Sequence, residues 1–191
     1  YAAIEPPFPM ATLAGYVREK GFTVEVIDAN VENFDPKEVA QLVKTIDPEL
    51  VVMVVSGSQP SASTQNMTVA GEICKVIKSM TKAKIAMAGL HPSALPERTL
   101  TEENIDFVIQ GEGYHTICLL LNCLIMDELN YFEVDGLWYV EEEKIKHSDS
   151  ALLLNLNKYK IEPAWDLFPM EKYRAHNWHC FDDLENRGNY G

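Results

Sequence analysis

The six-residue run Leu50-Val-Val-Met-Val-Val55 constrains the fold of this chain most, because it is apolar at every position. Apolar residues at helical spacing lie on both sides of it. The helix before it opens at Asp35-Pro-Lys-Glu38, and the helix after it covers residues 64 to about 80. A short strand that is apolar on both faces, between amphipathic helices, is typical of a parallel sheet covered on both sides. We therefore predict an α/β fold.

The alternation of helices and strands continues along most of the chain. Helices are predicted over about residues 9–20, 96–101 and 116–126, and strands over residues 22–28, 84–88 and 105–110. The helices that flank the apolar run should bury Val39, Leu42, Val43, Ile46, Met67, Ala70, Ile73, Cys74 and Ile77. This order predicts a doubly wound, mainly parallel, Rossmann-like sheet with the flavodoxin-type strand order. No strand precedes the first helix, so we expect the first strand to lie upstream.

The pattern changes in the last third of the chain. We expect residues 1–128 to form the Rossmann-like domain and residues 129–150 to form a small β-hairpin outside the main sheet. Its two strands are predicted at Gly136–Val140 and Lys144–His147. Residues 151–191 lose apolar periodicity and should form an extended linker, with one helical turn near residues 167–173.

The charge of the chain excludes several classes of partner. Its 16 Lys and Arg residues against 29 Asp and Glu residues give a formal charge of −13. An acidic chain gains nothing from the counterion release that drives nucleic-acid binding, and anionic lipid repels it. The apolar runs are too short to span a bilayer. Four cysteines without framework-like spacing suit a reducing compartment, so we expect a cytoplasmic protein without nucleic-acid or membrane partners.

Three loops of small and polar residues follow three of the predicted strands: Ser56–Ser63, Ala88–Ser93 and Gly111–His115. Ligands of open parallel sheets bind beyond the carboxyl ends of the strands, where such loops converge. Each loop alone is more often an ordinary turn, and their shared position is what favours a binding site. The candidate binding residues are Ser56, Gly57, Ser58, Gln59, Ser61, Ser63, Ala88, Gly89, Leu90, His91, Pro92, Gly111, Glu112 and Gly113.

Several of these motifs carry a family resemblance. The stretch from Tyr16 to Gly113 resembles a cobalamin-binding domain, with Ser56-Gly-Ser58 and Ala88-Gly89 as its small-residue loops. Four segments resemble the N-terminal half of cobalamin-dependent radical S-adenosylmethionine enzymes, in the branch of the anaerobic magnesium-protoporphyrin monomethyl ester cyclase and its methyltransferase relatives. These segments are Pro6–Ala14, Val26–Asp28, Ala88–Pro92 and Gln110–Gly113, and Trp165–Arg174 is similar to the segment that leads into the catalytic barrel.

The resemblance implies a function, and the chain departs from the family's motifs in two places. It implies that the loop residues bind cobalamin and that the parent chain adds a radical domain with a 4Fe-4S cluster and S-adenosylmethionine, for methyl transfer or oxidative cyclisation. The segment Glu5–Met10 holds no His where many cobalamin domains supply an axial ligand, and His91 is only a disfavoured axial contact. The cluster signature Cys-x-x-x-Cys-x-x-Cys is missing, so we expect no catalysis by this chain alone and a catalytic half beyond Gly191.

Two other classes of protein share the predicted topology. A phosphotransfer receiver needs an Asp after the third strand and a Lys after the fifth, but the chain has Ser56 and Gly111 there. A Rossmann-like domain without cofactor, used for substrate recognition or protein contact, remains an alternative. The group His176, His179 and Cys180 is a weak zinc motif, because no second ligand pair accompanies it.

Overall fold

The computed structural model describes residues 4–57, 60–127, 130–155 and 157–174. Two of the candidate binding residues, Ser58 and Gln59, lie outside the described residues, and so does the group His176, His179 and Cys180. The chain divides into two compact units. Residues 36–161 form the larger unit, and residues 1–35 with 162–191 form the smaller one.

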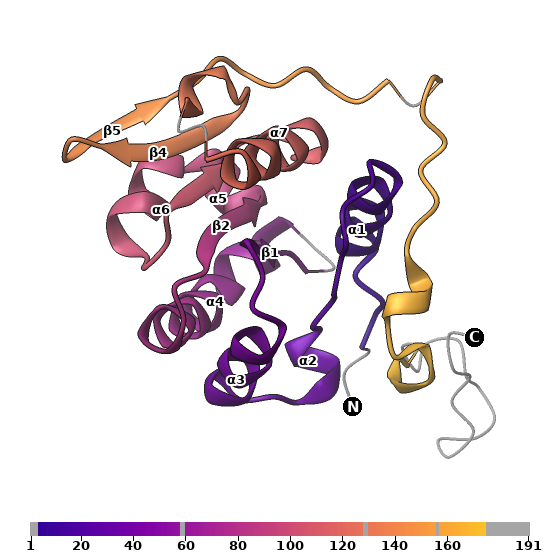
Figure 1. The fold of residues 1–191 in the computed structure, drawn as a ribbon. Helices are drawn as coiled ribbons and strands as arrows, with labels where there is room; N and C mark the ends of the chain where they lie inside the picture. Colours follow the sequence, from indigo (N-terminus) through magenta and orange to yellow (C-terminus); the bar gives the residue numbers. More distant parts are fainter. Residues whose placement is uncertain (1–3, 58–59, 128–129, 156, 175–191) are drawn as a thin grey trace. The chain divides into compact units, whose positions relative to one another are not determined.

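The larger unit is built on one five-stranded sheet with the strand order β1-β2-β3-β4-β5 (Figure 1). Its strands are β1 (Leu50–Val55), β2 (Lys84–Gly89), β3 (Phe107–Ile109), β4 (Leu137–Glu141) and β5 (Lys144–His147). The first three strands are parallel, β4 is antiparallel to β3, and β5 is antiparallel to β4. This arrangement confirms the predicted α/β, Rossmann-like fold.

In the described part of the larger unit, one α-helix precedes β1, and four α-helices and one short 3-10 helix connect the strands. They are α3 (Pro36–Ile46), α4 (Pro60–Met80), α5 (Leu90–Ala94), α6 (Pro96–Glu102), α7 (Tyr114–Ile125) and η1 (Tyr131–Glu133). Helix α4 buries all five of its predicted inward residues. In α3, Val39 and Val43 are buried, but Leu42 and Ile46 are 37% and 39% exposed, so its buried face is narrower than predicted. Among the described residues, no helix has the length and apolar content needed to cross a membrane.

The burial of the strands follows their place in the sheet. The residues of β3 are buried, as are those of β2 from Ile85 to Ala88, because both strands have neighbours on each side. In the apolar run that forms β1, only Val55 is buried and the other five residues are half-buried. The predicted cover on both sides is therefore incomplete for β1, which is the outermost strand of the described sheet.

The β4–β5 hairpin forms as predicted, but its predicted place outside the main sheet is wrong. Strand β4 pairs with β3 through Phe107 and Tyr139, Val108 and Trp138, and Ile109 and Leu137. The physical reason is that β3 would otherwise present an unpaired row of backbone N–H and C=O groups. The sequence could not reveal this pairing. The buried residues Leu137 and Tyr139 alternate with more exposed ones in the same way in a separate hairpin and in a hairpin that extends a sheet.

The predicted strand over residues 22–28 is also wrong, because these residues are extended but pair with no strand among the described residues. A β-strand needs a hydrogen-bonded neighbour as well as suitable side chains. In the flavodoxin-type order, that neighbour is a strand ahead of the first helix. The described residues before that helix form only one isolated bridge, between Ile4 and Arg174.

The smaller unit packs the end of the described chain against its beginning. Its elements are α1 (Phe8–Glu19), α2 (Ala29–Glu32) and two 3-10 helices, η2 (Trp165–Leu167) and η3 (Met170–Lys172). Phe168 and Tyr173 are buried in a cluster with Ala11 of α1. The backbone N–H of Ala164 donates to the carbonyl of Ala11 across 3.0 Å. Residues 162–174 therefore pack against α1, and η2 and η3 overlap the helical turn predicted near residues 167–173.

A hydrogen bond from the buried Tyr173 side chain joins two segments of the smaller unit. The Tyr173 hydroxyl donates to Asp28 Oδ2 across 2.7 Å, while Asp28 Oδ1 accepts the N–H of Asn30 at the start of α2. Burial raises the pKa of Tyr173, and the hydrogen bond to Asp28 raises it further. Tyr173 is thus a neutral donor at physiological pH, which ties the end of the described chain to the cap of α2.

The contact between α1 and residues 162–174 predicts that a side chain at Gly15 destabilises the smaller unit. A Cβ atom there would overlap the carbonyl oxygen of Glu162 and lie 3.1 Å from its carbonyl carbon. We expect Gly15→Ala to separate residues 162–174 from α1, with a loss of about 2–4 kcal/mol in the free energy of unfolding. Gly21→Ala is the control, because a Cβ there meets no atom within 4 Å and the substitution should cost only about 1 kcal/mol, through backbone strain at φ +94°. Equal effects in chemical denaturation would contradict the packing argument.

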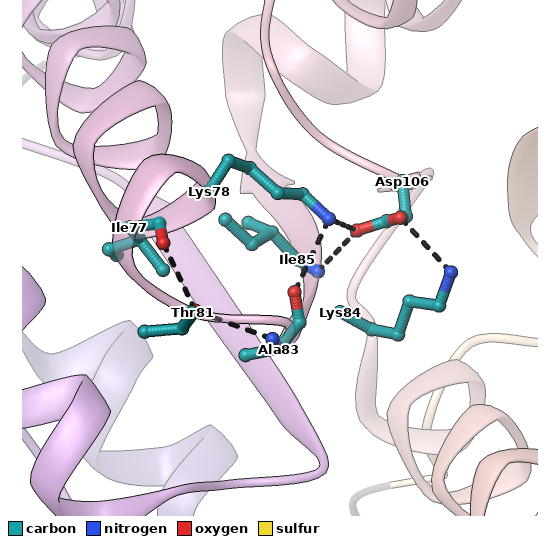
Figure 2. A network of polar contacts seen from close by, with 7 residues as sticks. All are labelled: Ile77, Lys78, Thr81, Ala83, Lys84, Ile85 and Asp106. Atoms are coloured by element: carbon teal, nitrogen blue, oxygen red, sulfur yellow. Dashed lines mark hydrogen bonds and ion pairs between the residues drawn. The ribbon is translucent and has the colours of Figure 1, made fainter.

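A polar network joins the amino ends of β2 and β3 in the larger unit (Figure 2). Asp106, just before β3, accepts hydrogen bonds from the Lys78 ammonium and from the backbone N–H of Ile85, the latter across 2.8 Å. Lys84 Nζ lies 3.3 Å from the other carboxylate oxygen. Lys78 also donates to the carbonyl of Ala83, so one lysine holds the end of α4 against both strands. This edge of the sheet is stabilised by charge-assisted bonds.

Asp106→Ala should therefore destabilise the larger unit. The substitution leaves the half-buried Lys78 ammonium and the Ile85 N–H without their acceptor. We expect a loss of about 1–3 kcal/mol in the free energy of unfolding. Lys84→Ala is the matched control, because its side chain is 48% exposed and its ion pair with Asp106 contributes at most about 1 kcal/mol. A larger loss for Lys84→Ala than for Asp106→Ala would contradict the network.

Candidate functional site at the carboxyl edge of the sheet

The parallel strands bring the three predicted loops to one edge. Val55 at the end of β1 is in register with Gly89 at the end of β2, and β3 ends at Ile109 on the same side. The loop Ser56–Ser63, the segment Ala88–Ser93 and the loop Gly111–His115 all begin there. The carboxyl edge of a parallel sheet is where open α/β folds bind their ligands.

The first loop is shorter than predicted, because α4 begins at Pro60 and includes Ser61 and Ser63. The Ser63 side chain is buried, and its hydroxyl donates to the Val55 carbonyl across 2.7 Å. The same oxygen accepts the backbone N–H of His91 across 3.0 Å. Ser63 therefore joins the end of β1 to the second loop from inside the protein.

The second loop is also more ordered than predicted, because residues 90–94 form α5 in place of a simple turn. Gly89 precedes it with φ +131°, and a Cβ atom at Gly89 would overlap the carbonyl oxygen of Val55. Glycine alone fits this close approach of two strands at positive φ. In α5, Pro92 is buried and Leu90 is 61% exposed. His91 Nδ1 lies 2.9 Å from Thr64 Oγ1 of α4, which adds a second bond between the first two loops.

The third loop is attached to the second by Ser93. The backbone N–H of Gly111 donates to Ser93 Oγ across 2.8 Å, and the Gln110 side-chain amide donates to the Ser93 carbonyl across 3.4 Å. Glu112 is exposed, and its carboxylate accepts the backbone N–H of Leu154 across 2.7 Å. The buried Gly113 precedes α7 in the left-handed conformation. Hydrogen bonds thus link all three predicted loops into one continuous surface.

The described candidate residues divide into three groups by burial. Ser63, Ala88, Pro92 and Gly113 are buried and shape the edge from inside. Gly57, Ser61, Leu90, Gly111 and Glu112 are exposed, while Ser56, Gly89 and His91 are half-buried. The exposed group is the part of the site that a ligand can contact directly.

The sequence interpretation missed three residues that build the site: Asn66, Ser93 and Gln110. The Asn66 side-chain amide donates to the Ser56 carbonyl across 2.7 Å and so holds the start of the first loop. Ser93 and Gln110 hold the second and third loops together. The sequence signal of Ser93 and Gln110 is their position within a few residues of a strand end, whereas Asn66 lies inside α4 and carries no such signal. Their partners are distant in sequence and could not be paired in advance.

The site is nearly free of charge. None of the three loops contains Lys or Arg, and Glu112 is their one carboxylate. Outside the loops, burial raises the pKa of Glu103, and repulsion by Glu102 adds to this, while His91 acts in the opposite direction. In the described part of the chain, no group of three or more His, Cys, Asp or Glu side chains could hold a metal ion. Hydroxyls, backbone amides and small side chains suit a bulky ligand whose polar groups are mostly neutral.

The fold and this edge define an α/β ligand-binding domain, and comparison with known families specifies its kind. Residues 1–121 match the model of the B12 binding domain family. The match covers more than half of the 191 residues. The chain belongs to the B12-binding domain family.

Curated relatives extend well beyond the part that this chain matches. An uncharacterized methyltransferase of Pyrococcus horikoshii is 33% identical over 174 residues, which cover 89% of this chain and 36% of the relative. The anaerobic magnesium-protoporphyrin IX monomethyl ester cyclase of Synechocystis sp. is 26% identical over 175 residues, with 88% and 33% covered. The chain therefore spans about a third of the length of these two relatives.

Solved structures share the fold. The radical S-adenosylmethionine methyltransferase TsrM from Kitasatospora setae, with cobalamin and a 4Fe-4S cluster bound, matches with a TM-score of 0.67 at 21% identity, covering 85% of this chain and 30% of TsrM. The cobalamin-dependent S-adenosylmethionine radical enzyme OxsB, in its apo form, matches with a TM-score of 0.70 at 23% identity, covering 84% and 22%. The α/β architecture is thus that of the corresponding part of two radical enzymes.

Two glycines of the site allow a direct test of its geometry. Gly89 and Gly111 both have positive φ, but only a Cβ at Gly89 would overlap another strand, whereas a Cβ at Gly111 meets nothing within 4 Å. We expect Gly111→Ala to cost about 1 kcal/mol through backbone strain and Gly89→Ala to cost at least about 2 kcal/mol more. Thermal and chemical unfolding of the two variants measure the difference. Equal losses would show that β1 and β2 are not as close at Gly89 as described.

Proposed function

We propose that the linked loops at the carboxyl edge of β1, β2 and β3 bind cobalamin, as the cobalamin-binding module of a radical S-adenosylmethionine enzyme. The main support is the hydrogen-bonded junction of three small-residue loops, in a chain that belongs to the B12-binding domain family. The corrin ring of cobalamin carries uncharged amide side chains, and neutral hydroxyl and backbone groups suit such a ligand. The composition of the loops therefore fits the cofactor.

We assign different roles to the exposed and the buried candidate residues. Gly57, Ser61, Leu90, Gly111 and Glu112 would contact cobalamin, since their surfaces are open. The predicted residues Ser58 and Gln59 remain part of the proposed site by sequence position. Ser63, Ala88, Pro92 and Gly113 would hold the loops in shape, because they are buried.

His91 remains a disfavoured axial contact to the cobalt. Its Nδ1 lies 2.9 Å from the Thr64 hydroxyl, so one ring nitrogen already has a partner within the protein. Its backbone N–H is bonded to Ser63. These contacts suit a residue that fixes the first loop to the second, and we propose this as its main role.

The activity of the whole protein is a further part of the proposal. Both curated relatives are about three times longer than the part matched here, and TsrM is described as a methyltransferase with cobalamin and a 4Fe-4S cluster. We propose that the parent chain contains a radical domain with such a cluster and S-adenosylmethionine, for methyl transfer or oxidative cyclisation. When bound, cobalamin would supply a cobalt centre that can carry a methyl group. The part of the chain described here would bind and orient it.

The alternative, a domain without cofactor that serves in protein contact, is not favoured by the family assignment. We also propose a cytoplasmic location. No described cysteine forms a disulfide, and thiols are the stable form in a reducing compartment. Burial raises the pKa of the Cys74 thiol to about 12, so this cysteine is inert at neutral pH.

Cobalamin binding can be measured directly. The purified chain, incubated anaerobically with hydroxocobalamin and passed through gel filtration, should elute with the visible absorption of the corrin ring. Leu90→Glu should weaken binding at least about tenfold, because a bound ligand would desolvate the added carboxylate without pairing it. Titration of the absorption spectrum gives the dissociation constant.

The matched control is Val69→Glu. Val69 is 57% exposed on α4 and Leu90 is 61% exposed, so the two substitutions add the same charge at similar exposure. Val69→Glu should keep the wild-type affinity. A wild-type chain that elutes colourless would refute cobalamin binding. Equal affinities for the two variants would place the cofactor elsewhere on the molecule.

A further inference from the structure

The Gln110 side chain links three parts of the larger unit. Gln110 follows β3 and immediately precedes the third loop. Its Oε1 accepts the indole N–H of Trp138 on β4 across 3.0 Å. Its Nε2 donates to the carbonyl of Ser93, at the end of the second loop, across 3.4 Å. One amide thus connects the hairpin to both loops.

The two partners determine which way the amide points. The indole N–H of Trp138 can only donate a hydrogen bond, and the Ser93 carbonyl can only accept one. The oxygen of Gln110 must therefore face Trp138, and its nitrogen must face Ser93. A carboxylate of the same shape would satisfy Trp138 but would place an oxygen against the Ser93 carbonyl. Glutamine is the residue that meets both requirements.

Two backbone N–H groups add further hydrogen bonds to this connection. We call the hydrogen bonds that join Ser93, Gln110, Gly111 and Trp138 the clamp. Ser93 Oγ accepts the N–H of Gly111, the residue after Gln110, across 2.8 Å. The backbone N–H of Gln110 donates to the carbonyl of Gly136, just before β4, across 2.8 Å. Ser93 is thus attached to two consecutive residues of the third loop, one through its hydroxyl and one through its carbonyl. The separation of the second and third loops depends on these bonds.

The hairpin fixes the tryptophan that orients the clamp. Trp138 pairs with Val108 of β3 and stacks on His147 of β5, with the ring centroids 4.5 Å apart and the planes at 25°. The backbone of Trp138 is therefore fixed by β3, and its ring is held by His147 of β5. A half-buried amide held by a fixed donor keeps one rotamer, and the Ser93 carbonyl keeps its position with it.

We propose that Gln110 is a positioning residue: oriented by Trp138, it fixes the distance between the second and third loops and so sets the affinity of the edge for cobalamin. This inference rests on the proposed function. It gives the β4–β5 hairpin a role in binding although the hairpin supplies none of the candidate contacts. The same bonds predict a protected Gly111 amide in the protein without ligand.

Three substitutions separate the steps of this argument. Gln110→Glu keeps the acceptor for Trp138 and loses the donor to Ser93. Gln110→Met keeps the length of the side chain and loses both bonds. Trp138→Phe keeps an aromatic ring against His147 and loses the indole N–H together with one of the two fused rings. Each should weaken hydroxocobalamin binding about threefold to tenfold, the range expected for one or two net hydrogen bonds. Each should also speed amide hydrogen exchange at Gly111.

Two controls distinguish positioning from a general loss of stability. Tyr139→Phe changes the neighbouring aromatic residue of β4 and should leave both the affinity and the exchange at Gly111 unchanged. Asp106→Ala removes the network at the opposite ends of β2 and β3 and should lower the unfolding midpoint while keeping the affinity. A merely structural role for Gln110 would make its variants behave like Asp106→Ala.

The outcomes separate this inference from the proposed function. Faster exchange at Gly111 together with weaker binding in the Gln110 variants supports the positioning role. Unchanged exchange refutes the clamp, and faster exchange with wild-type affinity refutes its link to binding. A wild-type chain that binds no hydroxocobalamin overturns the proposed function and the affinity part of the inference with it. The exchange measurement then still decides whether Gln110 holds the two loops together.

Discussion

The carbonyl group of Val55 is the point on which the carboxyl edge of the sheet depends. It accepts the hydroxyl of Ser63, and it lies so close to Gly89 that no side chain fits between them. The same Ser63 oxygen accepts the N–H of His91. One backbone oxygen therefore places the end of β1, the start of α4 and the start of α5 within a few ångströms, before any ligand is considered.

The two ends of the strands use different chemistry. At the amino ends, charge-assisted bonds from Lys78 and Lys84 to Asp106 stabilise the sheet. At the carboxyl ends, the loops consist of neutral hydroxyl-bearing residues and glycines, and they are joined by uncharged hydrogen bonds. Charged side chains would stabilise this edge too, but they would bring a solvation cost to any ligand of neutral amides. The charged network and the proposed binding site thus lie at opposite ends of the same strands.

Local patterns predicted the elements better than their partners. The apolar run of β1 and the inward residues of α4 follow from periodicity, and the three small-residue loops follow from the rule that parallel strands end together. Residues 22–28 have the side chains of a strand but no described neighbour, and pairing is not a local property. Leu137 and Tyr139 show the same alternation in a free hairpin and in an extended sheet. The bonds of Ser93 and Trp138 to Gln110 join residues 17 and 28 positions apart, which no pattern in a single sequence reveals.

The antiparallel pair β4 and β5 has a topological consequence. After a crossover, a parallel strand ends at the same edge of the sheet as the strand before it. An antiparallel strand ends at the opposite edge, and a second antiparallel strand brings the chain back to the first edge. Because His147 at the end of β5 pairs with Trp138 near the start of β4, the chain leaves the sheet at the carboxyl edge. Leu154 then reaches Glu112 of the third loop. Because the number of antiparallel strands is even, the segment that follows β5 starts at the carboxyl edge of the sheet, and no long connection is needed to bring it there.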